Sequence, residues 1–184
     1  MKVAVYCSAK DMIPAAYLAL GEELGAWIAA EGHTLVYGGA TGGLMTRVSD
    51  AVKAADGKVV GVIPRRIIEA KRMANNCDTL YVVANMSVRK QLMRTVADCF
   101  VCLPGSYGTL DEMMDVIASG TVHEHTKPIF VLNYEGFYEG LKLQAEHMRA
   151  LHFLPKVEQY APQFVDTMDE LKEKIKNLEL RIKK

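Results

Sequence analysis

Short apolar segments alternate with segments of helical periodicity along most of the chain. The short segments are rich in β-branched residues and predict strands at residues 2–8, 33–37, 58–62, 79–83, 99–103 and 128–132. Helical spacing predicts helices at 17–30, about 44–55, about 87–96, 109 to about 117 and 137–151. Short apolar strands separated by helices are typical of a mostly parallel sheet covered on both faces. The pattern therefore predicts a Rossmann-like α/β fold.

The end of the chain, from about residue 166 to residue 184, predicts an amphipathic helix. Leu171, Ile175, Leu178 and Ile182 recur at helical spacing among many charged residues, so this helix should pack one face against the body of the protein. The 184 residues contain no low-complexity linker, charge block or internal repeat. We therefore expect a single domain spanning residues 1–184.

Composition narrows the class of partner. Half of the residues are hydrophobic and 22 basic residues balance 22 acidic ones, so no overall field attracts the protein to a nucleic acid polymer or an anionic membrane. The sequence begins directly with an apolar strand and has no apolar run of 18 residues, so we expect a cytoplasmic protein without a membrane segment. The expected partner is a small molecule, and an anion would have to be held by a local site.

The cysteines and histidines predict neither a redox centre nor a metal site. Cys99 and Cys102 have CxxC spacing but lie on an expected strand, where residues three apart point to opposite faces. The other two cysteines are isolated, which favours four reduced, mostly buried thiols in a reducing compartment. The His-Glu-His sequence at 123–125 lacks an HExxH motif or a second ligand cluster, so a solvated turn is the better interpretation.

Two glycine-rich loops follow expected strands, where ligands of parallel sheets collect. The first, residues 36–45, carries four glycines: Gly38, Gly39, Gly42 and Gly43. These would let the backbone turn sharply and approach a ligand closely. The loop is neither a Walker A motif nor a GxGxxG motif. A plain tight turn therefore explains it about as well as a binding loop does.

The second loop, residues 103–112, ends a strand and opens a helix. Thr109 can cap that helix, while Gly105, Gly108 and the intervening N–H groups can form a cradle for phosphate. Glu112 falls in the first helical turn beside the cradle, where it would either complete a capping box with Thr109 or face a ligand. Taken alone, the three-residue spacing favours capping slightly over catalysis.

Two cations, Arg89 and Lys90, are expected early in the helix at about 87–96. Cations at a helix N-terminus oppose the helix dipole, so an ordinary solvated surface explains them poorly. An anionic partner would relieve this opposition.

These three stretches, in this order, resemble the signatures of the LOG (Lonely Guy) family: a GGxxGLM loop, a Met-His-Glu-Arg-Lys segment and a PGGxGTxxE loop. Here they are Gly-Gly-Ala-Thr-Gly-Gly-Leu-Met at 38–45, Met-Ser-Val-Arg-Lys at 86–90 and Pro-Gly-Ser-Tyr-Gly-Thr-Leu-Asp-Glu at 104–112. Residues 61–64 and 127–133 match further landmarks, so the resemblance extends from residue 3 to about residue 155. Together the paired motifs are far more specific than any glycine run.

The resemblance implies a Rossmann-like, homodimeric nucleoside 5'-monophosphate phosphoribohydrolase. Such an enzyme splits AMP or a cytokinin riboside 5'-monophosphate into free base and ribose 5-phosphate, without a metal or cofactor. Arg89 and Glu112 match the two catalytic positions. The glycine loops and the resemblance together assign substrate contacts to Gly38, Gly39, Glu69, Lys90, Gly105, Ser106, Tyr107, Gly108 and Thr109.

Three departures from the family pattern bear on this expectation. Ser106 replaces a glycine, Ser87 and Val88 replace His-Glu, and Ala118 stands where many relatives have Thr. Ser106 restricts the loop backbone but adds a hydroxyl donor, so phosphate binding can survive. The other changes concern base preference and rate more than reaction type.

Cleavage of an N-glycosidic bond builds positive charge on the anomeric carbon and ring oxygen, which a nearby carboxylate stabilises. Glu112 is the candidate, either for this role or for orienting or deprotonating the attacking water. Arg89 would hold the phosphate or ribose, or assist the departing base. Lys90 and the loop N–H groups would clamp the phosphate.

Three other functions compete with the enzyme. A non-enzymatic nucleotide or molybdenum-cofactor carrier would use the same cradle; Arg89 with Glu112 favours the enzyme, whereas Ser87 and Val88 keep the carrier open. A pyridoxal-phosphate lysine decarboxylase, an older label of the family, needs a Schiff-base lysine and normally a longer chain, so it is rejected. A purely structural domain is disfavoured because two glycine loops and a cationic pair converge on one sheet edge.

Overall fold

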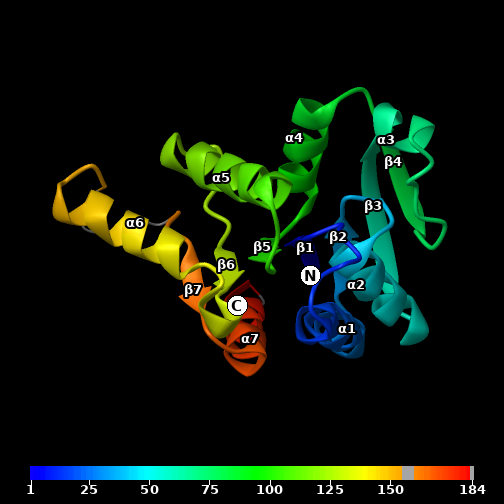
Figure 1. Ribbon diagram of the computed structural model, residues 1–184, viewed down its shortest axis with the longest axis horizontal. Helices are drawn as coiled ribbons and strands as arrows, with labels where there is room; N and C mark the ends of the chain where they lie inside the picture. Colours follow the sequence, from blue (N-terminus) through cyan, green and yellow to red (C-terminus); the bar gives the residue numbers. More distant parts are fainter. Residues whose placement is uncertain (155–159, 183–184) are drawn as a thin grey trace.

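One parallel sheet organises the computed structural model, which describes residues 1–154 and 160–182. The strand order is β4-β3-β2-β1-β5-β6-β7, and every neighbouring pair is parallel (Figure 1). The strands are β1 (Lys2–Tyr6), β2 (Thr34–Tyr37), β3 (Lys58–Pro64), β4 (Thr79–Val83), β5 (Cys99–Cys102), β6 (Ile129–Leu132) and β7 (Gln163–Val165). The predicted Rossmann-like α/β fold is confirmed.

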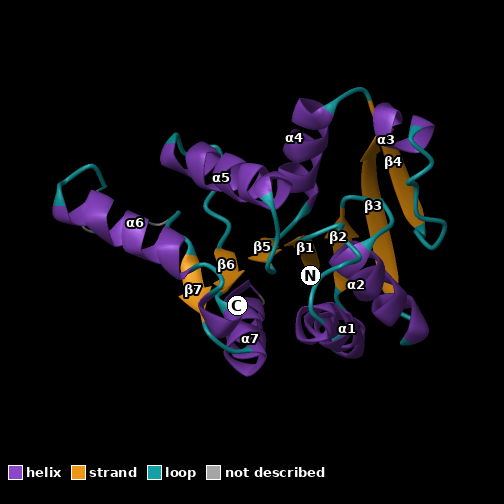
Figure 2. Cartoon of the chain, viewed as in Figure 1, coloured by secondary structure: helices purple, strands orange, loops and turns teal. Residues whose placement is uncertain are grey.

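Helices cover both faces of this sheet (Figure 2). They are α1 (Ala15–Ala30), α2 (Gly43–Ala54), α3 (Arg65–Glu69), α4 (Met86–Val96), α5 (Tyr107–Thr121), α6 (Glu139–Ala150) and α7 (Met168–Ile182), with a 3-10 turn η1 (Tyr134–Gly136). The helices α1, α2 and α7 lie on one face, and α4, α5 and α6 lie on the other. None of the described helices is long and apolar enough to cross a membrane.

Alternate residues of the strands fill two apolar cores, one on each face. On β1, Val3 and Val5 pack against α1, α2 and α7, whereas Ala4 and Tyr6 face α4 and α5. Both faces are fully buried, which is why the strand reads as a continuous apolar run. The free thiols of β5 follow the same rule, because Cys99 lies in one core and Cys102 in the other. The strand geometry expected for this CxxC spacing is confirmed.

The chain reverses its direction of travel across the sheet next to β1. Strands β1 to β4 extend to one side, and the chain then returns through α4 to place β5 on the other side of β1. In parallel sheets this switch point opens a crevice at the carboxyl ends of the strands. The loops after β1 and β5 therefore diverge where a ligand can enter.

Several boundaries differ from the sequence expectation. Two short elements, α3 and β7, are additional; α3 buries no residue and β7 buries one, so neither produces a readable apolar period. The helix expected at 109 begins at Tyr107 and continues to Thr121. The helix expected at 137–151 begins at Glu139, after η1. The expected C-terminal helix is α7; residues 183–184 of that prediction lie outside the described residues.

Candidate functional site

A cavity of about 230 Å³ lies at the carboxyl edge of the sheet, where the two glycine loops meet. Residues that end or follow β1, β2, β3 and β5 line it, together with residues of α4 and α5. Its lining includes Cys7, Gly38, Met45, Pro64, Ile67, Arg72, Met86, Arg89, Ser106, Gly108, Thr109 and Glu112. The structure therefore brings together six of the site residues expected from the sequence: Gly38, Arg89, Ser106, Gly108, Thr109 and Glu112.

A buried ion pair forms one wall of the cavity. The Nη1 of Arg89 donates to Oε1 of Glu112, and the two residues are only 6% and 5% exposed. The Arg89 Nε also donates to the carbonyl oxygen of Val62 on β3 at 2.9 Å, which fixes the plane of the guanidinium. A Cβ at Gly38 would lie 2.1 Å from Nη2 of Arg89, so a side chain at this position would displace the guanidinium.

Burial dominates the electrostatics of this pair. It raises the pKa of the Glu112 carboxyl, and the positive charge and hydrogen bond of Arg89 oppose that rise. Burial also raises the pKa of the Cys7 thiol, with Glu112 adding to the effect. Cys7 lines the cavity as a neutral thiol and is therefore not a reactive nucleophile.

The start of α5 presents its backbone to the cavity. Ser106 is the N-cap but its side chain accepts no capping hydrogen bond. Within the described part of the chain, the N–H groups of Tyr107, Gly108 and Thr109 have no acceptor. A helix N-terminus with open N–H groups favours an anion.

Thr109 does not cap this helix, so that prediction is wrong. Thr109 is the third residue of α5, and its hydroxyl packs on Gly105, where a Cβ would come within 2.1 Å of Oγ1. The capping box with Glu112 is also absent, because Glu112 accepts from Arg89 instead. Glu112 is therefore not a capping carboxylate.

Lys90 lies outside the cavity. Its Nζ is 2.8 Å from Asp111 and 3.5 Å from Asp115, both on α5. The carboxylates of α5 thus supply the anionic partners that the two cations at the start of α4 require: Glu112 for Arg89, and the two aspartates for Lys90. The helix α4 also has its own cap, because the Asn85 side chain accepts from the N–H of Val88.

The first glycine loop contributes only one of its four glycines, Gly38, to the cavity lining. Gly39 has φ +67° and packs near Leu80 and Gly61, away from the cavity lining. The N–H groups of Gly42 and Gly43 at the start of α2 donate to Thr46 Oγ1 and Asp11 Oδ1, each at 2.7 Å. These two donors of the second helix N-terminus are therefore already used within the protein.

The remaining expected site residues lie at or beyond the margin. Tyr107 is 89% exposed and does not line the cavity, and Glu69 is exposed at the end of α3. Gly105 lines an adjacent apolar cavity of about 390 Å³ that shares Ser106 with the first. Ser87 and Val88, two departures from the family pattern, are exposed on α4 and do not line the cavity.

Arg72 is a lining residue that the sequence reasoning missed. It lies between α3 and β4, and an isolated antiparallel bridge between Ala40 and Met73 holds this segment against the first glycine loop. The N–H of Thr41 donates to the Arg72 carbonyl at 2.8 Å. A single bridge leaves no periodic signal in the sequence, so only the fold reveals this neighbour.

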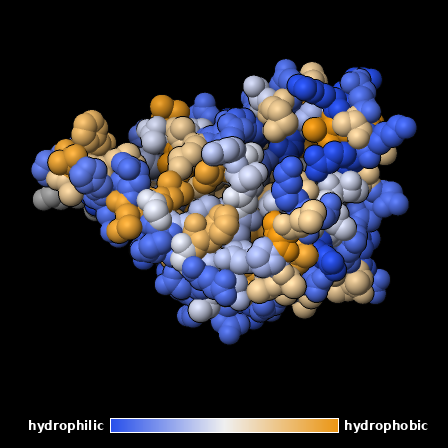
Figure 3. Space-filling view, viewed as in Figure 1, coloured by the Kyte–Doolittle hydropathy of each residue, from blue (hydrophilic) through white to orange (hydrophobic). Residues whose placement is uncertain are grey.

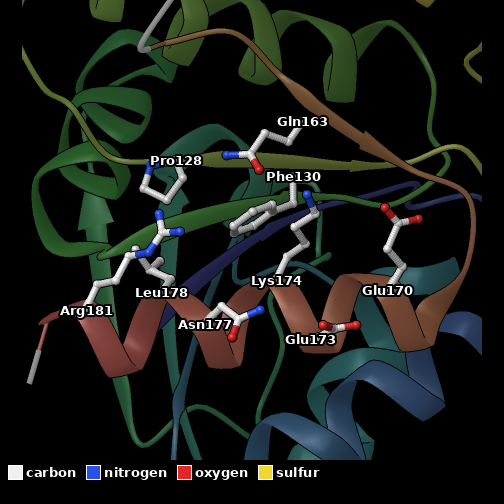
Figure 4. A pocket seen from close by; sticks show the side chains of 9 residues that line it. All are labelled: Pro128, Phe130, Gln163, Glu170, Glu173, Lys174, Asn177, Leu178 and Arg181. Atoms are coloured by element: carbon white, nitrogen blue, oxygen red, sulfur yellow. The ribbon is translucent and has the colours of Figure 1, made fainter.

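Another cavity, of about 340 Å³, lies between α7 and the amino ends of β6 and β7 (Figure 4). Cations and carboxylates both line it, including Lys174, Arg181, Glu170 and Glu173. It contains no residue of the two glycine loops or of the Met-Ser-Val-Arg-Lys stretch, and it lies at the opposite ends of the strands. The carboxyl-edge cavity is therefore the candidate active site.

A parallel α/β fold with a buried Arg-Glu pair beside an open helix N-terminus defines a protein of the nucleotide-handling Rossmann-like class. Comparison with known proteins gives the family. A family model described as "Possible lysine decarboxylase" matches residues 45–175. The chain is 38% identical to a cytokinin riboside 5'-monophosphate phosphoribohydrolase of Mycobacterium marinum, over 91% of this chain and 89% of that one.

A protein of the same name from Mycobacterium tuberculosis is 41% identical over 76% of this chain and 74% of its own. Among solved structures, the molybdenum cofactor binding protein of Rippkaea orientalis superposes with a TM-score of 0.72 over 96% of each chain, at 21% identity. At that identity the likeness shows the fold alone. The chain belongs to the LOG family, the family covered by the "Possible lysine decarboxylase" model.

Proposed function

We propose that this protein hydrolyses the N-glycosidic bond of a nucleoside 5'-monophosphate, either AMP or a cytokinin riboside 5'-monophosphate, to give the free base and ribose 5-phosphate. The buried pair of Arg89 and Glu112 carries the proposal, because it faces a cavity next to the open N-terminus of α5. The names of the M. marinum and M. tuberculosis relatives support the same reaction.

In this mechanism Glu112 acts on the sugar. The bond from the anomeric carbon to the base nitrogen breaks, and its electron pair leaves with the base. The Glu112 carboxylate stabilises the positive charge that develops on the anomeric carbon and ring oxygen. A water adds its oxygen to the anomeric carbon, and its proton balances the departing base. Arg89 holds the carboxylate in place, and its charge favours the ionised form against the effect of burial, which raises the pKa of Glu112.

The start of α5 serves substrate binding. Its free N–H groups at Tyr107, Gly108 and Thr109 are donors for the 5'-phosphate, and the positive end of the helix dipole adds to the attraction. The phosphate does not react, so its binding energy can be used to fix the ribose against Glu112. Ser106 adds a hydroxyl donor at the same loop.

Two other functions fit the cavity less well. A molybdenum-cofactor carrier shares the fold, but a carrier has no need for a buried carboxylate held by an arginine. A pyridoxal-phosphate decarboxylase needs a Schiff-base lysine. No lysine lines the cavity within residues 1–154 and 160–182, and Lys90 points to Asp111 instead.

The test is a comparison of AMP with adenosine as substrates of the purified protein, with free adenine measured by chromatography. We expect kcat/KM for AMP to exceed that for adenosine by about 10²-fold or more, because several charge-assisted hydrogen bonds are lost with the phosphate. A panel that includes a prenylated adenosine monophosphate then sets the base preference. Equal turnover of AMP and adenosine would overturn the proposed role of the α5 N-terminus.

The assembly and compartment are also proposals. Residues 1–184 form one domain, an inference supported by a sheet that takes strands from Lys2 to Val165.

A homodimer is supported by α6, which buries none of its residues and forms with α5 an apolar groove of about 250 Å³. In Figure 3, hydrophobic residues lie among hydrophilic ones at the left of the molecule, where Figure 1 places α6. A cytoplasmic location is supported by four free cysteines. Light scattering after size exclusion measures the assembly, and a monomeric mass would contradict it.

A further inference from the structure

Two arginines line the candidate active site among the described residues, Arg72 and Arg89. They differ in their partners. Arg89 is neutralised by Glu112. Arg72, in contrast, has no carboxylate within 4 Å in the described ranges 1–154 and 160–182, and its one side-chain hydrogen bond runs from Nη2 to the carbonyl oxygen of Thr41 at 3.1 Å. Its guanidinium therefore retains donors and a full positive charge.

The backbone of Arg72 is held firmly although its side chain is exposed. Its carbonyl accepts from the N–H of Thr41 at 2.8 Å and from the Thr41 hydroxyl at 3.3 Å. Two residues further on, the N–H of Ala74 donates to the carbonyl of Gly39 at 3.0 Å. These bonds fix the segment on the first glycine loop, so the guanidinium is kept at the cavity wall made by that loop.

Other sources of positive charge at the cavity are already used. The N–H groups of Gly42 and Gly43 at the start of α2 already donate to Thr46 and Asp11, and the carboxylate of Asp11 disfavours a phosphate at this helix end. Lys90 is paired with Asp111 and Asp115 outside the lining. Among the described residues that line the cavity, a phosphate thus meets the N–H groups of α5 and one cation without a carboxylate partner, Arg72.

We propose that Arg72 binds the 5'-phosphate of the nucleotide substrate and thereby selects monophosphates over nucleosides, an inference that rests on the proposed function. A guanidinium presents parallel donors that match two phosphate oxygens, which makes arginine the preferred partner for such groups. Arg72 then supplies the charge and the start of α5 supplies directed N–H donors. Arg89 of α4 remains paired with Glu112, the carboxylate that acts on the sugar.

The test compares Arg72→Ala and Arg72→Lys with the wild-type protein on AMP and adenosine. We expect Arg72→Ala to lower kcat/KM for AMP about 10- to 100-fold, mostly through KM, and to leave turnover of adenosine within about twofold. Arg72→Lys should recover part of the loss, because it restores the charge but not the paired donors. The matched control is Arg66→Ala, which removes the same charge from exposed α3 outside the cavity.

A binding experiment tests the role of Arg72 independently of the proposed hydrolysis. Titration calorimetry with ribose 5-phosphate and with ribose should give binding of the phosphate ester that weakens at least 10-fold in Arg72→Ala and is unchanged in Arg66→Ala. This result supports the role of Arg72 even where AMP is not cleaved. Unchanged affinity for ribose 5-phosphate in a folded Arg72→Ala protein overturns it, as does an equal loss of AMP and adenosine turnover. Circular dichroism melting confirms that each variant is folded.

Discussion

Replacing Glu112 by glutamine changes one atom in the buried pair and separates catalysis from packing. The amide keeps the shape of the side chain and can still accept one hydrogen bond from Arg89. It removes the negative charge, so the Arg89 guanidinium, 6% exposed, is left without its counter-charge. Removing one member of a buried pair costs about 3–5 kcal/mol. Because the hydrogen bond survives, we expect the lower end of that range in the free energy of unfolding.

The rate should fall much further than this loss of stability explains. A carboxylate that stabilises an oxocarbenium-like charge is worth about 10²-fold or more in kcat, and the amide lacks that charge. KM for AMP should change less, because the start of α5 and Arg72 are untouched. The assay is steady-state release of adenine at a temperature where urea titration shows the variant fully folded.

Asp115→Asn is the matched control for this experiment. Asp115 is a carboxylate three residues further along α5 that pairs with Arg94 and Lys90 outside the cavity. Its replacement should lower stability while leaving kcat within a few-fold. A folded Glu112→Gln protein that retains most of its turnover of AMP would remove Glu112 from the mechanism and favour the carrier.

Three further predictions follow from the same geometry. The acid limb of the pH profile of kcat/KM should lie above the value of about 4.3 expected for a solvated glutamate, because burial raises the pKa of Glu112 and activity is lost as the pH falls through it; a limb at or below that value contradicts the raised pKa. Lys90→Ala should change KM for AMP less than about threefold, because its Nζ is held by Asp111; a tenfold rise would show that Lys90 reaches the substrate. Gly38→Ala should reduce activity on the order of 10²-fold, since its methyl group would displace the Arg89 guanidinium; unchanged activity with unchanged melting would refute the close approach.

Most of the fold follows from the apolar pattern, because buried parallel strands leave continuous apolar runs. The run at 99–103 predicts a strand, and its residues in β5 are fully buried. The elements that were not predicted have no such run. For example, α3 has five residues and none of them is buried. Short elements of this kind are formed by the tertiary structure around them, so their own residues carry too little signal.

The candidate site was predictable where a motif lies on one segment. The start of α5 and its glycines belong to a single loop, so the motif alone places them at the carboxyl edge. Pairings across segments were not predictable. Neither the partner of Arg89, 23 residues away in the sequence, nor the position of Arg72 on the first glycine loop has a local signal. The glycine content of that loop also suggested more ligand contacts than the structure supports, because the sequence does not reveal that Asp11 accepts from the N–H of Gly43.

The contrast between Arg89 and Lys90 shows how neighbouring cations acquire different tasks. Successive residues on a helix point about 100° apart, so only one of the two can face the sheet. Arg89 turns inward, bonds the Val62 carbonyl and reaches Glu112, whereas Lys90 and Arg94 run along the outside of α5 to its aspartates. These pairs join α4 to α5 outside the cavity lining. The family's Arg-Lys signature therefore places one cation against the buried carboxylate of the cavity and the other against an aspartate of α5 outside it.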